Sequence, residues 1–192
     1  MLDSWARSWD RPVAFPPPPH PFSVDLAHCA FVSGCVLSKK PDRVLELGIG
    51  PGYLSRALLD ALAYNRKGAL TCVDGFFDTH GIEPAHVEPL RRAGAEVVVS
   101  TEEAFVKACP SESFDMLVSD ADHGRSQEWL DDHLRIVKPG GFLFFHDTNN
   151  AMFPNLGAIV EQVARLPHHH FTANSRPDES CERGLLFVMK PA

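Results

Sequence analysis

Apolar positions along this chain follow two patterns: short continuous runs, and longer stretches in which apolar residues recur every three or four positions. The short runs have the length of buried strands and predict five strands, at residues 44–47, 69–73, 95–99, 114–119 and 142–145. The longer stretches have helical spacing and predict helices, at residues 24–37, 54–63, 84–93, 103–109, 127–137 and 156–166. Two further strands, at residues 171–175 and 185–189, are expected to form a final antiparallel pair.

Strands that alternate with helices predict a single-domain α/β fold with a doubly wound, seven-stranded, mostly parallel sheet and an antiparallel last strand. Ligands of such sheets bind beyond the carboxyl ends of the strands. The domain is expected to span residues 24–192. Residues 1–23 carry two tryptophans and the proline run FPPPPHP, and they form an N-terminal arm that is either a partly ordered tail or a lid over the ligand.

Composition and charge narrow the function. The 192 residues suit one domain, and no apolar run approaches the roughly 20 residues that span a bilayer. A net charge of −7 argues against a broad nucleic-acid-binding face, because phosphate binding needs clustered cations. The five cysteines form no C-x-x-C pair and the N-terminus lacks an apolar signal core, which favours reduced thiols in a cytoplasmic protein.

The stretch RVLELGIGPGYLSRALL combines a strand, a glycine turn and the start of a helix. Gly48, Gly50 and Gly52 permit positive φ and the close approach of a ligand, and a helix start presents unpaired N–H groups. The dinucleotide fingerprint G-x-G-x-x-G is not met, because Tyr53 stands three residues after Gly50. An acidic residue, Glu46, instead precedes the glycines in the pattern E-x-G-x-G-x-G.

This pattern resembles the first motif of class I S-adenosylmethionine-dependent methyltransferases. The resemblance implies that the glycine loop passes under the methionine part of S-adenosylmethionine, and that Glu46 orders the loop and its bound water. It also implies that Asp74, after the second strand, binds the ribose, because a carboxylate can accept a hydrogen bond from each of the two ribose hydroxyls. The structural alternative is a glycine turn without a ligand, with Asp74 as a loop cap.

Further cofactor contacts follow from the same resemblance. Gly75 adjoins the ribose-binding aspartate, and Thr101 and Glu102 stand after the third strand, where the family contacts the adenine ring. The Gly-Asp pair common in the family is absent from that position. With the acid that ends the fourth strand, the expected cofactor-binding residues are Glu46, Gly48, Gly50, Gly52, Asp74, Gly75, Thr101, Glu102 and Asp120.

A second group of polar residues follows the fourth and fifth strands. Asp120 begins the run D-A-D-H, and Asp147 lies within H-D-T-N. Neighbouring parallel strands lie about 4.8 Å apart, so the two carboxylates should converge, and a divalent cation such as Mg²⁺ would relieve their repulsion. Thr148 or Asn149 could supply a neutral third oxygen, whereas the imidazole of His146 suits Mg²⁺ poorly.

The runs D-A-D-H, K-P-G-G and H-D-T-N resemble the metal-dependent small-molecule O-methyltransferases of the catechol, caffeoyl-CoA and macrocin types, over residues 44–149. The resemblance implies that Asp120 and Asp147 bind the metal, with Thr148 where the catechol and caffeoyl types have asparagine. It further implies that His123, three residues after the first aspartate, is the general base, a role that suits an imidazole. In the alternative interpretation these side chains only cap a helix and a loop.

The sequence therefore predicts an S-adenosylmethionine-dependent methyltransferase that acts on a hydroxyl of a small molecule, with Mg²⁺ as the candidate metal. Two alternatives stay open: a metal-independent methyltransferase acting on nitrogen or another acceptor, and a non-catalytic cofactor-binding protein. Neither nucleic acid nor a membrane is an expected partner, and the oligomeric state is open, a homodimer included. The three histidines at residues 168–170 are predicted to lie at a solvated boundary before a strand, where they would bind metal adventitiously.

Overall fold

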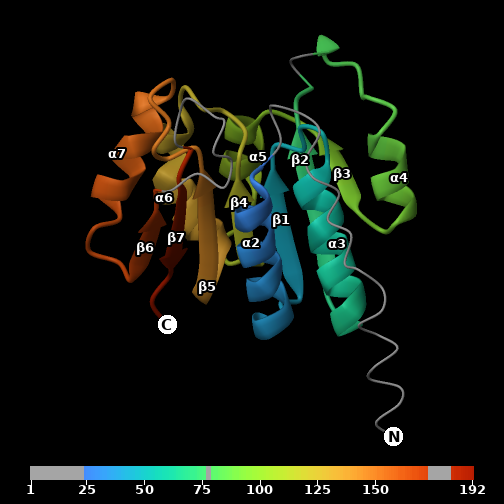
Figure 1. Cartoon of the computed structure of the whole chain (residues 1–192), viewed down its shortest axis with the longest axis horizontal. Coiled ribbons are helices and arrows are strands. Elements are labelled where there is room, and N and C mark those ends of the chain that lie inside the picture. Colours follow the sequence, from blue (N-terminus) through green and yellow to red (C-terminus); the bar gives the residue numbers. More distant parts are fainter. Residues whose placement is uncertain (1–23, 77–78, 173–182) are drawn as a thin grey trace, which may run out of the picture.

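The computed structural model describes residues 24–76, 79–172 and 183–192, so the predicted N-terminal arm at residues 1–23 lies outside the described part of the chain. The described residues form one seven-stranded sheet with the order β3-β2-β1-β4-β5-β7-β6 (Figure 1). The strands are β1 (Arg43–Leu47), β2 (Ala69–Asp74), β3 (Glu96–Val99), β4 (Phe114–Ser119), β5 (Val137–His146), β6 (His168–Phe171) and β7 (Leu185–Met189).

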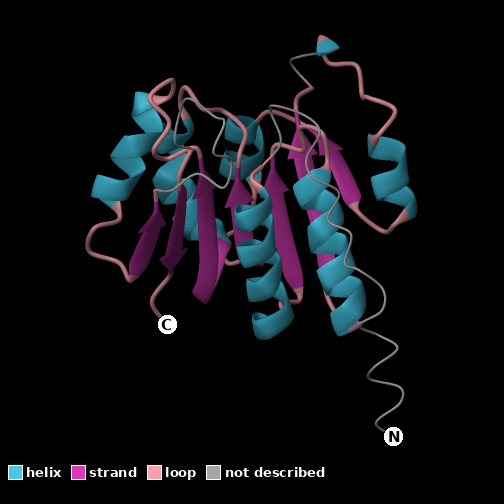
Figure 2. Ribbon diagram, in the orientation of Figure 1, coloured by secondary structure: helices cyan, strands magenta, loops and turns pink. Residues whose placement is uncertain are grey.

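Strands β1 to β5 pair in parallel, and β7 runs antiparallel to both β5 and β6. Figure 2 shows the arrowheads of β1, β4 and β5 at one edge of the sheet, so the loops that follow these strands meet there. The chain winds outward from β1 in one direction and from β4 in the other, which places the loops after β1 and β4 side by side. The doubly wound, mostly parallel sheet predicted from the sequence is confirmed.

Helices cover both faces of this sheet (Figure 2). In chain order they are α2 (Leu26–Lys39), α3 (Tyr53–Asn65), α4 (Val87–Arg92), α5 (Glu102–Ala108), a 3₁₀ turn η2 (Ser126–Trp129), α6 (Leu130–Ile136) and α7 (Pro154–Gln162). None of the described helices is long and apolar enough to cross a membrane.

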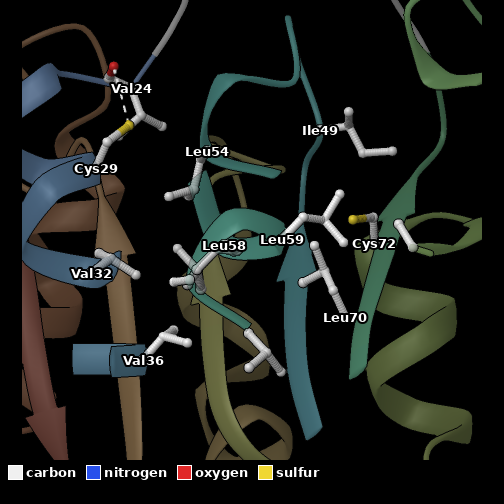
Figure 3. Close-up of a cluster of buried hydrophobic side chains, with 14 of the residues drawn as sticks. Val24, Cys29, Val32, Val36, Ile49, Leu54, Leu58, Leu59, Leu70 and Cys72 are labelled. Atoms are coloured by element: carbon white, nitrogen blue, oxygen red, sulfur yellow. Dashed lines mark hydrogen bonds between the residues drawn. The ribbon is translucent and has the colours of Figure 1, made fainter. Parts of the chain in front are cut away.

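Side chains along β1 alternate between two apolar cores, one on each face of the sheet. Val44 belongs to the core beneath α2 and α3, whereas Leu45 and Leu47 belong to the core beneath α5, α6 and α7. Figure 3 shows the first core, into which α2 and α3 project Val32 and Leu58. Because β1 is buried on both faces, its carboxyl end is a rigid platform for the loop that follows.

The structure differs from the predicted elements at two places near β5. The predicted helix at residues 127–137 is divided into η2 and α6, which ends where β5 begins. The K-P-G-G run, predicted as a turn before the strand, lies within β5 as a bulge, since Phe114 pairs with Val137 while Met116 pairs with Phe142. Proline lacks an N–H donor and Gly140 has a φ of 71°, so the chain leaves the regular ladder there without leaving the sheet.

The run of three histidines also lies elsewhere than predicted, because it forms most of β6 instead of preceding a strand. His168 and His169 are exposed, and His170 is half-buried beside β7. The described cysteines, at positions 29, 35, 72 and 109, are free thiols.

Candidate active site

The glycine loop joins β1 to α3 at the carboxyl edge of the sheet. Gly48, Gly50 and Gly52 have φ of 88°, 48° and 80°, so each occupies the left-handed region that favours glycine. Gly48 also lies against the chain that leaves β4: a Cβ built on Gly48 would come 2.2 Å from the backbone oxygen of Asp120. The strand, glycine turn and helix predicted from the sequence are present, and the turn touches the end of β4.

Asp74, at the end of β2, holds this glycine loop in place. Its Oδ2 accepts hydrogen bonds from the backbone N–H groups of Ile49 at 2.8 Å and Gly50 at 3.4 Å. Its Oδ1 accepts one from Phe76 N–H at 2.6 Å. Asp74, predicted to bind the ribose, is therefore adjacent to the loop predicted to bind the methionine part, and Gly75 follows Asp74 directly in the chain.

Glu46, the acidic residue of the glycine motif, lies under the loop and is fully buried on the α2 and α3 face of β1. The thiol of Cys72 donates a hydrogen bond to its Oε2 at 3.1 Å. Burial raises the pKa of Glu46 to about 8, so the carboxyl keeps its proton at neutral pH. Its position agrees with a role in ordering the loop from below.

The raised pKa of Glu46 makes a contribution to folding stability that falls as pH rises, because the folded state keeps a proton that the unfolded state has lost. Glu46→Gln removes that contribution. We compare the free energy of unfolding of the unmutated protein with that of the variant at each pH. We expect the advantage of the unmutated protein to shrink by about 2 kcal/mol between about pH 5.5 and pH 7.5. Urea unfolding of both proteins at each pH measures it, and a constant difference would contradict the assignment.

Thr101 and Glu102 stand at the start of α5, directly after β3. The Thr101 hydroxyl caps the helix by accepting a hydrogen bond from Ala104 N–H at 3.0 Å. The Glu102 side chain lies inside the domain, where its Oε1 pairs with His133 at 2.8 Å. Oε2 of Glu102 accepts the backbone N–H of Asp122 at 3.0 Å. The structure thus places the Glu102 carboxylate as a buried support for the loop after β4, and its contact with the adenine ring stays a prediction.

The serines beside Glu102 complete this buried network. Ser119 and Ser126 approach Oε1 of Glu102 at 2.9 and 2.7 Å. Although burial opposes ionisation, these contacts and His133 keep the pKa of Glu102 below its usual value. A buried carboxylate with this many partners fixes the loop that carries the D-A-D-H run.

The D-A-D-H and H-D-T-N runs meet in a cluster of two carboxylates and two imidazoles. His123 Nε2 lies 3.2 Å from Oδ1 of Asp120 and 3.1 Å from Oδ2 of Asp147. His146 Nδ1 lies 3.1 Å from Oδ1 of Asp120 and 3.6 Å from Oδ2 of Asp147. The convergence of the two aspartates, predicted from strand pairing, is present, and His123 and His146 lie between them.

The charges of this cluster stabilise one another. Burial disfavours each ion, yet the imidazoles lower the pKa of Asp120 and Asp147, the second of them strongly. In turn, the carboxylates outweigh burial and raise the pKa of His123 and His146 to about 10. Without a metal ion, His123 is therefore an imidazolium at neutral pH and serves as the counter-ion of both aspartates.

The donor set of the cluster fits a divalent cation. Ligand atoms of Asp120, His146 and Asp147 all lie within 4.8 Å of one another, and these side chains are largely buried. The hydroxyl of Thr148, the predicted third ligand, lies 3.0 Å from Nε2 of His170, and its role as a ligand stays a prediction. An imidazole in the third position favours a first-row transition ion over Mg²⁺, which prefers oxygen.

Two features border the cluster that sequence reasoning did not identify. The Phe153 ring packs on His123 with centroids 4.5 Å apart and an interplanar angle of 32°. A shallow surface depression, too small to hold a water molecule, is lined by residues of both runs, among them Ala121 and His146, and by Leu156. Phe153 lies in the segment after β5 that the sequence left without a chemical assignment, and its apolar ring gave no signal of the contact.

Residues on α2 were also missed. Asp25 and His28, three residues apart at the start of α2, are buried and face His146. Burial and the neighbouring His146 lower the pKa of His28 to about 4, which keeps its ring neutral at pH 7. In the sequence, an aspartate and a histidine on the apolar side of the predicted helix at residues 24–37 were the feature that could have identified these residues.

Comparison with known proteins gives a family and a fold. Residues 45–148, more than half of the chain, match the model of a family described as a methyltransferase domain. No curated protein matches the sequence. The matched segment contains the glycine loop, Asp74, the D-A-D-H run and Asp147, so it covers both groups of site residues.

Solved structures share the fold at low sequence identity. An O-methyltransferase from Bacillus cereus in complex with SAH is 16% identical, with a TM-score of 0.70 over 99% of this chain and 100% of that one. TomG from Streptomyces achromogenes, an O-methyltransferase of tomaymycin synthesis in complex with SAM, is 16% identical, with a TM-score of 0.68 over 96% and 85%. An S-adenosylmethionine-dependent O-methyltransferase from Thermotoga maritima is 14% identical, with a TM-score of 0.65 over 88% and 67%. The Rossmann-like methyltransferase architecture expected from the motifs is confirmed.

Proposed function

The chain belongs to the methyltransferase domain family, and from this premise we propose that it transfers the methyl group of S-adenosylmethionine to a hydroxyl oxygen of a small molecule. The observation that carries the proposal is the contact between Gly48 and the backbone of Asp120. It joins the loop expected to bind the cofactor to the cluster expected to bind the acceptor. The solved O-methyltransferases that share the fold, one with SAH and one with SAM, support this cofactor.

Bound S-adenosylmethionine supplies a methyl group that is already activated by its sulfonium charge. The protein therefore has to hold the acceptor oxygen in line, at about 3 Å, and to remove its proton; positioning of this kind is worth about 7–11 kcal/mol. In this proposal the glycine loop and Asp74 bind the methionine and ribose parts. The acceptor binds beside Asp120, at the adjacent strand end.

A divalent cation between the aspartates is the finer part of the proposal. Asp120 and Asp147 would hold it, and it would lower the pKa of an acceptor hydroxyl and fix its position. In the metal-free cluster His123 takes the role of that cation, since its imidazolium lies 3.2 and 3.1 Å from the two carboxylates.

The role of His123 as general base follows from the same contacts. An imidazole accepts a proton only in its neutral form, and the two carboxylates hold the pKa of His123 at about 10. A cation on Asp120 and Asp147 would replace the imidazolium as their charge partner and return His123 to the neutral form. The proposal thus links metal binding to the protonation state of His123. The Phe153 ring, packed on His123, keeps the imidazole in position.

Two measurements test the function. Calorimetry with S-adenosylmethionine and S-adenosylhomocysteine should show binding of both. Release of S-adenosylhomocysteine should then be followed with a panel of small hydroxylated compounds, with and without EDTA and added Mg²⁺ or Mn²⁺. Full activity in EDTA would favour a metal-independent methyltransferase, and binding without turnover of any compound would favour a non-catalytic protein. Absence of cofactor binding would overturn the proposal.

Asp74→Asn tests the cofactor site directly. The substitution keeps the size of the side chain and removes the charge that accepts the loop N–H groups and, in the proposal, the ribose hydroxyls. Hydrogen bonds to a charged group are worth about 1.5–3 kcal/mol, so we expect the Kd for S-adenosylmethionine to rise at least about tenfold by calorimetry. Asp60→Asn, which alters an exposed carboxylate on α3, is the matched control and should leave the Kd unchanged.

A further inference from the structure

A second group of metal-ligating side chains lies on the α2 side of His146. Asp25 and His28 come from the start of α2, and together with His146 they place one ligand atom each within 4.8 Å of one another. All three residues are buried, with exposed fractions of 0, 5 and 2% in that order. The His28 and His146 rings meet edge to face, with centroids 5.3 Å apart, and Nδ1 of His28 lies 3.4 Å from Oδ2 of Asp25.

His146 is oriented toward this group by the carboxylates on its other side. Its Nδ1 lies 3.1 Å from Oδ1 of Asp120, whereas its Nε2 is buried and has no hydrogen-bond partner among the residues that the structure describes. Histidines that bind metals almost always donate their other ring N–H to a carboxylate, which fixes the tautomer and the ring. Asp120 is placed to fix His146 in this way, and an ion bound at Nε2 would displace the proton that this nitrogen carries in the imidazolium form.

The donors select the kind of ion. Two imidazole nitrogens and one carboxylate oxygen are the ligands of mononuclear sites for Zn²⁺ and similar first-row ions, whereas Mg²⁺ prefers oxygen alone. Three protein ligands leave a further coordination position for water or a small ligand. The burial of the group also matches a site that excludes solvent.

We propose that Asp25, His28 and His146 bind one Zn²⁺-class ion, at a site separate from the Asp120 and Asp147 carboxylates proposed for the methyl-transfer reaction. The ion would join the first turn of α2 to the end of β5, two segments far apart in sequence. Because His146 borders both groups, an ion on its α2 side would hold the imidazole in contact with Asp120 on its other side. The inference does not depend on methyl transfer.

The experiment uses the full chain with His168→Gln and His169→Gln, because these exposed histidines of β6 are an alternative source of metal binding. The protein is stripped with a chelator, dialysed against Zn²⁺ and then against metal-free buffer, and its zinc is counted by mass spectrometry. We expect about one Zn²⁺ per chain at this site, counted in Asp147→Asn, in which the neighbouring carboxylate cluster lacks one of its own ligands. His28→Gln and Asp25→Asn should each weaken Zn²⁺ binding at least tenfold, whereas Asp147→Asn should retain it.

X-ray absorption at the zinc edge is measured on the chain that carries only His168→Gln and His169→Gln. This measurement does not depend on whether the variants at Asp25, His28 or Asp147 fold. Two histidine ligands are expected, and fewer would overturn the proposal. Failure to retain Zn²⁺ would also overturn the proposal. The same holds if His28→Gln retains as much Zn²⁺ as the chain without that substitution, or if only Asp147→Asn loses it. Cofactor calorimetry is independent of these results, so failure of this site and failure of the methyltransferase proposal can be told apart.

Discussion

Gly48→Ala is expected to destabilise the domain by about 2–5 kcal/mol, the sum of overpacking and of a left-handed residue that carries a Cβ. The added carbon would lie 2.2 Å from the carbonyl oxygen and 3.0 Å from the Cα of the chain leaving β4, at Asp120 and Ala121. These are backbone atoms, so no side-chain rotation relieves the clash. Domains of this size are stable by about 5–15 kcal/mol, so the loss should be plain in urea unfolding.

Gly50→Ala is the matched control for this prediction. Gly50 also has positive φ, 48°, but a Cβ there meets nothing within 4 Å, so only the conformational cost of about 1–2 kcal/mol remains. The two variants therefore separate crowding from backbone conformation. Equal destabilisation by both would show that the loop does not press on the end of β4, and the observation behind the proposed function would be lost.

His123→Gln is expected to lower the rate of methyl transfer by about 10²–10⁴-fold, the usual contribution of a positioned general base. The same substitution should raise the affinity for Mn²⁺, because it removes the imidazolium that neutralises Asp120 and Asp147. The rate is measured as S-adenosylhomocysteine release with any accepted hydroxyl compound, and the affinity by calorimetry with Mn²⁺ alone.

The opposite directions of these two effects distinguish a base from a residue that only maintains the fold. A merely structural histidine would lower both the rate and the Mn²⁺ affinity. His169→Gln, an exposed change on β6, should alter neither. An unchanged rate in His123→Gln would remove His123 from the mechanism, and unchanged Mn²⁺ affinity would show that its charge does not compete with the cation.

The fold was predictable because the local signals agreed. Apolar runs bounded by turns located β1, β2 and β4, and three glycines at alternate positions predicted a turn. The convergence of Asp120 and Asp147 followed from strand adjacency alone. The K-P-G-G run could not be placed in this way, because proline and glycine are equally compatible with a turn and with a bulge that stays paired to β4.

Two predicted site residues, Glu102 and Thr148, make contacts that depend on tertiary structure. Glu102 follows a strand as a cofactor ligand would, yet the burial of His133 opposite it draws the carboxylate inward. Thr148 stands next to a predicted metal ligand, but its hydroxyl lies against His170, whose position depends on the pairing of β6 with β7. Neither partner is near in sequence, so no local pattern reports the contact.

The antiparallel course of β7 separates the last residues of the chain from the carboxyl edge of the parallel strands. β7 begins at Leu185, which pairs with His146, and runs back past Phe142 to the opposite edge, where Figure 1 places the last residues. A sensor-chip anchor or fluorescent label attached after Ala192 would therefore sit remote from the carboxylate cluster. Immobilised through that end, the molecule would present its strand tips to the flowing sample, with both proposed ion sites facing away from the support.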